Sequence, residues 1–189
     1  MNVFLCGVGG QGILLAAKIV AAAAEAAGYE VCANEIHGMA QRGGSVTAQI
    51  RYGAGVRHPL ILEGTADVLG ALEHTEALRH AHMLRPGGFA AIAKESVVPV
   101  TVSMGAASYP SDMDERIARA FPSHVYFDCA AKARELGDQR LANTLLVGIL
   151  STALADIPAE AWDAALRRRV PAKLLAPNLA AFAFGRSLR

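Results

Sequence analysis

The stretch V-F-L-C-G-V-G-G-Q-G at Val3–Gly12 decides the fold of this chain. Its apolar part, Val3–Cys6, predicts a buried strand, and a long helical pattern begins at Ile13. Between strand and helix the chain has four glycines: Gly7, Gly9, Gly10 and Gly12. In a strand–turn–helix unit of this kind, backbone N–H groups at the helix N-terminus face outward and favour an anion.

Each glycine of this turn has a candidate role. Gly7 permits a tight turn, Gly9 or Gly10 allows a ligand to approach the backbone, and Gly12 allows the helix to sit near the strand. The spacing also matches the dinucleotide-binding pattern. The same pattern fits a tight turn that binds nothing, so the spacing alone does not assign a ligand.

Composition predicts one globular domain spanning residues 1–189. The chain has 53% hydrophobic and 19% charged residues and no linker or repeat, which indicates a well-filled interior or a surface that a protein partner covers. A net charge of +1 argues against nucleic acid as the main ligand.

Cysteine and histidine placement argues against a metal site in this chain. The three cysteines are widely spaced, with no C-x-x-C pair, and are expected to be buried thiols in a reducing compartment. On a helix, His80 and His82 would project about 200° apart and could not share a metal ion. The N-terminus has no cleavable apolar segment, and Ile13–Ala27 carries Lys18 and Glu25. We therefore expect a cytoplasmic protein without membrane contact.

The order of segments predicts an α/β fold. After the helix Ile13–Ala27, Tyr29–Asn34 is expected to close a βαβ unit, with Glu35 where a dinucleotide fold places its ribose ligand. The later expected strands are Ala66–Leu72, Phe89–Ala93, an edge strand Val97–Val102, and Val125–Cys129. The later expected helices are Thr75–Leu84, Asp112–Phe121, and most of the chain after Ala130. The fold class is thus a mostly parallel, Rossmann-like sheet flanked by helices, with a helical C-terminal portion.

A second glycine-rich loop, His37–Ser45, departs from the Rossmann order. Arg42 within it is a candidate clamp for a phosphate or carboxylate, or a solvated loop residue. His37 is an acid–base candidate, although a lone loop histidine more often has a structural role. The strict alternation in Val46–Tyr52 predicts a strand near a sheet edge or one covered by a partner.

The two glycine loops together resemble a known family. G-V-G-G-Q-G-I at Gly7–Ile13 and E-I-H-G-M-A-Q-R-G-G-S-V at Glu35–Val46 are similar to the gamma-type subunit or domain of 2-oxoacid:ferredoxin oxidoreductases. Within that group the chain most resembles the small (beta) subunit of indolepyruvate ferredoxin oxidoreductases. The resemblance extends to blocks at Asp67–Glu73, Asn143–Gly148 and Asn178–Gly185.

The resemblance implies a function that this chain performs as part of a complex. Such enzymes decarboxylate a 2-oxoacid, here indolepyruvate or another aryl pyruvate, pass electrons to ferredoxin and form an acyl-coenzyme A. Thiamine diphosphate, magnesium and iron–sulfur clusters are expected on a larger partner subunit, because this chain has neither cluster cysteines nor a G-D-G…N stretch. We expect the isolated chain to be inactive and to bind none of these cofactors.

The candidate site combines both loops into one anion-binding mouth for coenzyme A or the oxoacid. Its predicted ligand-binding residues are Gly7, Gly9, Gly10, Gln11, Gly12, Glu35, Gln41, Arg42, Gly43, Gly44 and Ser45. Two other functions stay open at this point: a stand-alone NAD(P)- or flavin-binding oxidoreductase, and a non-catalytic assembly module.

Overall fold

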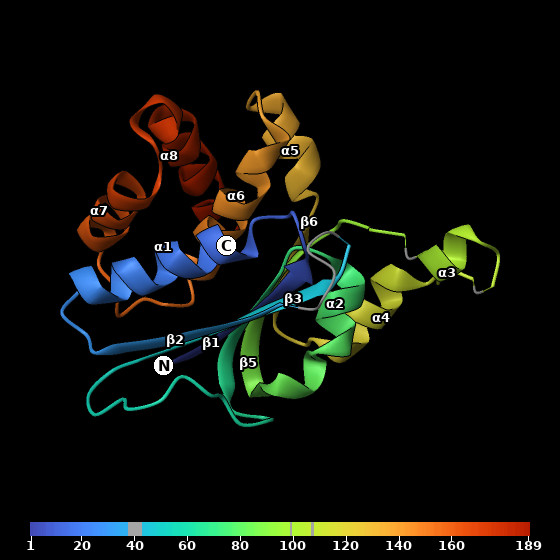
Figure 1. The fold of residues 1–189 in the computed structure, drawn as a ribbon, viewed down its shortest axis with the longest axis horizontal. Coiled ribbons are helices and arrows are strands. Elements are labelled where there is room, and N and C mark those ends of the chain that lie inside the picture. Colours follow the sequence, from blue (N-terminus) through green and yellow to red (C-terminus); the bar gives the residue numbers. More distant parts are fainter. Residues whose placement is uncertain (38–42, 99, 107) are drawn as a thin grey trace.

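A computed structural model describes residues 1–37, 43–98, 100–106 and 108–189, and only the backbone of residues 37, 100 and 101. Within these residues, six strands form one sheet in the order β2-β3-β1-β4-β5-β6 (Figure 1). β1, β4, β5 and β6 pair in parallel, and β3 pairs antiparallel with both β1 and β2. The strands are β1 (Asn2–Val8), β2 (Val31–His37), β3 (Ser45–Tyr52), β4 (Ala66–Ala71), β5 (Leu84–Ala93) and β6 (His124–Phe127).

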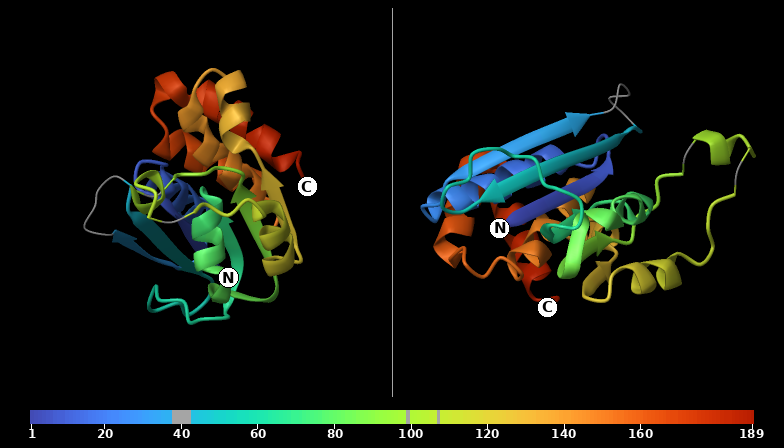
Figure 2. Two further views of the ribbon diagram at one scale, coloured as in Figure 1. Left: turned by 90° about the vertical axis from the view of Figure 1, so that its right-hand side faces the viewer. Right: turned by 90° about the horizontal axis from the view of Figure 1, so that it is seen from below.

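Helices cover both faces of the sheet, as the apolar strands require (Figures 1 and 2). One face packs on α1 (Ile13–Ala26) and α6 (Ala142–Ser151). On these lie α7 (Ala159–Arg169), packed on α1, α8 (Ala172–Arg186), packed on α6, and α5 (Cys129–Glu135), also beside α6. The other face packs on α2 (His74–Arg79) and α4 (Met113–Ala120). Short turns of helix lie at Ala81–Met83, α3 (Val100–Ser103) and Gln139–Leu141. The sequence-based fold class is confirmed.

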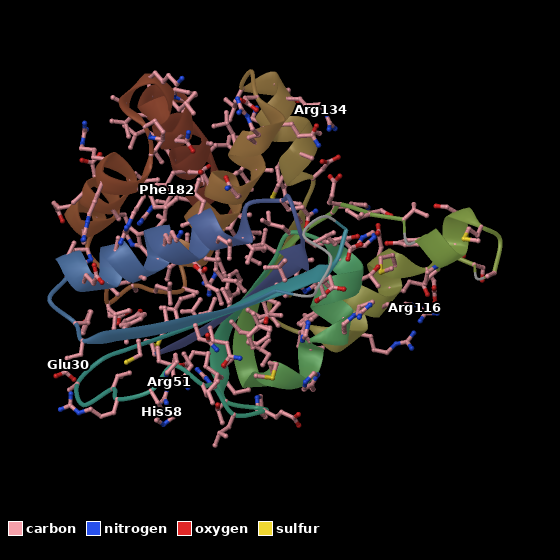
Figure 3. All side chains as sticks on the ribbon, in the orientation of Figure 1. Glu30, Arg51, His58, Arg116, Arg134 and Phe182 are labelled. Atoms are coloured by element: carbon pink, nitrogen blue, oxygen red, sulfur yellow. The ribbon has the colours of Figure 1, made fainter. Side chains whose placement is uncertain are left out.

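The alternating strand is β3, which lies next to the edge strand β2 and thus near a sheet edge, as its alternation predicts. β3 pairs with β2 on one side and β1 on the other, and it therefore separates the first and second strands of the expected βαβ unit. Its polar face is covered by the chain's own segment 53–65: the N–H of Ile61 donates to Gln49 Oε1 at 2.6 Å, and Arg51 Nη1 donates to the His58 carbonyl at 3.2 Å. Figure 3 shows Arg51 and His58 side by side beneath the sheet.

The prediction of an edge strand at Val97–Val102 is wrong, because the described residues of this range belong to no strand of the sheet. After Ala93 the chain leaves the sheet, because the N–H of Val97 donates to the side chain of Glu73 at 3.4 Å instead of to a neighbouring strand. Val100–Ser103 is helical. β5 starts at Leu84 rather than Phe89, since Leu84 already pairs with Ala66 ahead of a bulge.

The C-terminal helices pack on the sheet through a close contact of α6 with α8. A Cβ atom on Gly148 would lie 2.3 Å from the Phe182 carbonyl oxygen, and one on Gly185 would lie 2.1 Å from that of Leu145. Beside this contact, the Thr144 hydroxyl donates to Asn178 Oδ1 at 2.6 Å. These glycines therefore let the two helix backbones touch, which holds the helical portion in place.

A buried polar cluster anchors the segment between β5 and α4. Glu73 and His74, just after β4, are 1% and 7% exposed. The Tyr109 hydroxyl donates to Glu73 Oε1 at 3.1 Å and lies 2.7 Å from His74 Nε2, and His74 Nδ1 lies 2.8 Å from the Tyr126 hydroxyl. Each of the two ring nitrogens of His74 therefore lies within hydrogen-bond distance of one tyrosine hydroxyl. We call Glu73, His74, Tyr109 and Tyr126 the clasp.

The burial of His74 within the clasp predicts a pH-dependent stability. Burial lowers the pKa of His74, an effect that Lys94 supports and that Glu73 and Asp114 oppose. The unfolded state, with a pKa of about 6.5, thus binds more protons than the folded state at mildly acidic pH. The free energy of unfolding should fall as pH drops from 7.5 to 5.5. In His74→Gln it should be lower by about 1–3 kcal/mol at pH 7.5 but fall less with pH.

Urea unfolding at both pH values measures this, with the exposed His58 replaced in the control variant His58→Gln. The control should keep the wild-type pH dependence. A His74→Gln protein that loses as much stability as the wild type between the two pH values would contradict the assignment.

Candidate functional site

The chain leaves the sheet in opposite directions after β1 and β4. From β1 it crosses through α1 on one face to β2, and from β4 it crosses through α2 on the other face to β5. Such a switch point, at the carboxyl ends of parallel strands, is where open α/β sheets bind ligands. The Gln11 side chain spans this gap, as its Nε2 donates to the Leu72 carbonyl at 2.9 Å.

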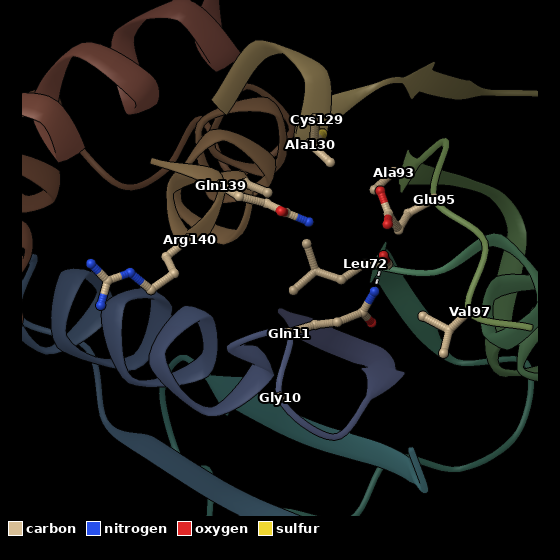
Figure 4. Close-up of a pocket in the computed structure, with 11 residues that line it drawn as sticks. Gly10, Gln11, Leu72, Ala93, Glu95, Val97, Cys129, Ala130, Gln139 and Arg140 are labelled. Carbon is tan, nitrogen blue, oxygen red and sulfur yellow. Dashed lines mark hydrogen bonds between the residues drawn. The ribbon is translucent and has the colours of Figure 1, made fainter. Parts of the chain in front are cut away.

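A cavity of about 330 Å³ opens at this point, and we call it the switch-point crevice (Figure 4). It collects residues that follow four different strands, which only the sheet brings together. The lining comprises Gly10, Gln11, Leu72, Ala93, Glu95, Val97, Cys129, Ala130, Gln139, Arg140 and Ala142. Sequence reasoning had assigned Gly10 and Gln11 to a site and had missed the rest, because no local pattern marks them.

The polar side chains of the crevice lining are those of Gln11, Glu95, Cys129, Gln139 and Arg140. Burial, reinforced by the charge of Asp128, raises the pKa of Glu95. Burial also raises the pKa of Cys129 to about 12, so this thiol is protonated at neutral pH and is a poor nucleophile. Arg140 binds Asp138 at 2.6 Å and points away from Gln11 (Figure 4), whereas the Gln139 amide points inward.

The glycine turn depends on its glycines for conformation and space. Gly10 and Gly12 have φ angles of 104° and 87°, a region that other residues rarely adopt. A Cβ atom on Gly12 would lie 2.3 Å from Asn143 Nδ2, which donates to the Gly12 carbonyl at 3.3 Å. The neighbour that needs Gly12 is therefore α6, and not the strand as the sequence suggested. The Gly12 carbonyl also gives the Asn143 side chain a hydrogen-bond acceptor outside its own apolar helix.

Two of the turn's N–H groups donate hydrogen bonds within the protein, so these two do not face outward as the sequence predicts. The N–H of Gly9 donates to the Gly44 carbonyl at 2.8 Å, and that of Gln11 donates to the Val8 carbonyl at 3.1 Å. The Gln11 Oε1 in turn accepts from the N–H of Val8 at 2.8 Å. A Cβ atom on Gly7 would lie 2.9 Å from that oxygen, so Gly7 makes room for the Gln11 side chain.

The described end of the second glycine loop, residues 43–45, lies beside the first loop. Besides the Gly9–Gly44 bond, the N–H of Gly43 donates to the Gly9 carbonyl at 3.5 Å. The Ser45 hydroxyl donates to Glu76 of α2, and β3 separates Glu35 in β2 from the glycine turn. The geometry therefore does not bring Glu35 to the position of a ribose ligand. Gln41 and Arg42 lie outside the described residues, and the side chain of His37 is not described.

A second cavity, of about 570 Å³, adjoins the glycine turn and carries two cations. Lys18 of α1 and Arg169 of α7 line it together with Gly9, Gly10 and Gly12. Arg169 Nε is buried without a hydrogen-bond partner among the residues that the structure describes. We call this cavity the cationic pocket.

Three consecutive arginines, Arg167, Arg168 and Arg169, end α7, and such a run is usually interpreted as a solvated helix end. Arg167 binds Asp163 at 2.6 Å and Arg168 binds Glu25 at 3.1 Å, which fits that interpretation for these two residues. Arg169 differs, because α7 packs against α1 and turns its third arginine toward the cavity. Nothing in the local sequence marks this difference.

In the described part of the chain, no group of three or more His, Cys, Asp or Glu side chains is placed to hold a metal ion. None of its helices there has the length and apolar character to cross a membrane.

Comparison with known sequences gives matches along the whole chain. Residues 2–188 match the model of the family described as pyruvate ferredoxin/flavodoxin oxidoreductase. Indolepyruvate oxidoreductase subunit IorB of Thermococcus kodakarensis is 39% identical over 188 residues, 97% of this chain and 93% of that protein. The subunit of the same name from Archaeoglobus fulgidus is 38% identical over 189 residues, 98% of this chain and 93% of that protein.

Comparison with solved structures supports the fold. The gamma subunit of a keto/oxoacid ferredoxin oxidoreductase from Geobacter sulfurreducens has a TM-score of 0.74 at 22% identity, covering 99% of this chain and 96% of that one. The 2-oxoglutarate:ferredoxin oxidoreductase of Magnetococcus marinus, solved with 2-oxoglutarate, coenzyme A and succinyl-CoA bound, has a TM-score of 0.72 at 22% identity. That match covers all of this chain but 30% of the longer one. On the full-length match to its model, the chain belongs to the pyruvate ferredoxin/flavodoxin oxidoreductase family.

Proposed function

We propose that this chain is the small subunit of an indolepyruvate-type 2-oxoacid:ferredoxin oxidoreductase. The observation that carries the proposal is the 39% identity to an indolepyruvate oxidoreductase subunit over 97% of the chain. The complex would decarboxylate an aryl pyruvate, transfer the electrons to ferredoxin and release an acyl-coenzyme A.

The redox and decarboxylation chemistry would reside on a larger subunit. The described residues of this chain offer no set of metal ligands, and the whole sequence has three widely spaced cysteines. We therefore assign thiamine diphosphate, its magnesium ion and the iron–sulfur clusters to the partner. The part that this chain plays is to shape the entrance for a substrate.

The cationic pocket and the switch-point crevice suit the two ends of coenzyme A. The cationic pocket has Lys18 and the unpaired Nε of Arg169 for a phosphate, since arginine and lysine are the usual phosphate ligands in proteins. The switch-point crevice has the Gln139 amide and apolar walls for an uncharged, amide-bearing arm. Gly10 lines both cavities, so one ligand can occupy the two.

The geometry favours this proposal over a stand-alone nicotinamide or flavin enzyme. A dinucleotide site needs free N–H groups in the first glycine turn and an acidic residue at the end of the adjoining strand. Here two of those groups bind the protein itself, and β3 separates Glu35 from the turn. Micromolar binding of NADH, NADPH or a flavin to the purified chain would overturn this preference.

The proposal predicts that activity requires the large subunit. Co-expression with it should give a stable complex that buries more than about 1,000 Å². That complex should reduce ferredoxin or a redox dye when supplied with an aryl pyruvate and coenzyme A, while each subunit alone should not. A large subunit that binds this chain but is equally active without it would instead support the assembly-module function.

The cationic pocket makes a finer prediction in the assembled enzyme. Arg169→Gln should raise the KM for coenzyme A about tenfold or more, because it removes a charge-assisted contact worth about 1.5–3 kcal/mol. The KM for the aryl pyruvate should change little. Arg167→Gln is the matched control on the same helix, since its guanidinium binds Asp163 away from the pocket. An unchanged KM for coenzyme A in Arg169→Gln contradicts the assignment of this pocket.

A further inference from the structure

A segment of the chain projects from the body at the crevice end of the sheet. Between β5 and α4, the described residues 98, 100–106 and 108, which include α3, extend away from the rest of the molecule (Figures 1 and 2). We call them the arm. The sixteen residues from Ser96 to Ser111 contain no charged side chain, whereas the whole chain is 19% charged.

The base of the arm is held firmly by one buried carboxylate. On the outgoing side, the N–H of Val97 donates to Glu73 Oε1 at 3.4 Å. On the returning side, the Tyr109 hydroxyl donates to the same oxygen at 3.1 Å and lies 2.8 Å from the Thr75 hydroxyl. Glu73 is 1% exposed, so the attachment is inside the protein. Both ends of the arm are therefore fixed at a single point.

The arm presents apolar side chains to the outside. Met104 is 78% exposed and Val98 is 50% exposed. Exposed loops without charged residues are unusual on a soluble surface, and methionine is a residue that adapts well to a partner's surface. A rigid base and an apolar, uncharged tip are together the features of a segment that inserts into another protein.

The position of the arm indicates which protein covers it. Val97, at the base of the arm, and Glu95 just before it both line the switch-point crevice. Whatever closes the mouth of that crevice therefore meets the arm, and under the proposed function this is the large subunit. In the Magnetococcus marinus enzyme, the part that matches this chain is 30% of one longer chain, so there the same fold is covalently joined to further protein.

We propose that the arm anchors this chain by inserting Met104 and Val98 into an apolar groove of the large subunit, beside the mouth of the crevice. The inference rests on the proposed function and adds the contact surface to it. The clasp serves to aim the arm, because Glu73 and His74 fix its base at the crevice edge of the sheet.

The test compares two charge substitutions at equally exposed apolar residues. Met104→Asp places a carboxylate in the proposed groove, and Leu62→Asp places one on segment 53–65, at the opposite end of β4. Leu62 is the matched control because it is 74% exposed, close to the 78% of Met104. Each variant is titrated against the purified large subunit by calorimetry or biolayer interferometry. Met104→Asp should weaken binding at least tenfold, and Leu62→Asp should stay within twofold of the wild type.

Thermal melting controls for folding, and Val98→Asp serves as a second variant should Met104→Asp melt early. If Met104→Asp and Val98→Asp bind the large subunit as tightly as the wild-type chain does, the role of the arm is overturned and the proposed function stays intact. A wild-type chain that does not bind the large subunit overturns both. A wild-type chain that dimerises by itself, and loses the dimer in Met104→Asp, overturns the inference in favour of a second copy as the partner.

Discussion

The side-chain amide of Gln11 joins the ends of two strands from which the chain departs in opposite directions. Its oxygen accepts from the N–H of Val8 at the end of β1, and its nitrogen donates to the Leu72 carbonyl after β4. The switch-point crevice and the cationic pocket both adjoin this bridge, because Gly10, next to Gln11, lines each of them. Gly7 and Gly12 lack side chains where other side chains come close: Gly7 leaves room for Gln11, and Gly12 leaves room for Asn143 of α6.

The N–H groups of Gly9 and Gln11 donate to carbonyls of the protein itself, so they are not available to bind an anion. In a dinucleotide fold, the backbone of the first turn and the helix N-terminus carry the phosphate. Here the adjoining loop uses the N–H of Gly9, through the carbonyl of Gly44. Under the proposed function, Lys18 in the second turn of α1 and Arg169 at the end of α7 would take over this role. A glycine pattern so close to the dinucleotide motif would then serve a different ligand.

The sequence predicted those features that local patterns encode. The strand, glycine turn and helix of Val3–Ala26, and the helical C-terminal portion, follow from apolar periodicity and turn residues. The position of β3 inside the sheet does not, because period two shows one polar face and cannot show that segment 53–65 covers it. The crevice was missed for a similar reason: Glu95, Cys129 and Gln139 are distant in sequence and meet only where parallel strands end. Arg169 became part of a pocket through the packing of α7 on α1, and the clasp joins Glu73 to Tyr109 across 36 positions.

Under the proposed function, the crevice end of the sheet faces the reactive centre of a larger subunit. The structure of the assembled complex, determined by electron cryomicroscopy with coenzyme A and an aryl pyruvate present, tests it most directly. In that structure, we expect the large subunit to cover the carboxyl ends of β1, β4 and β5. We expect a ligand between Gln11 and Glu95 or beside Arg169. A complex in which that end faces solvent, and the large subunit contacts the opposite end of the sheet near Leu62, would contradict it.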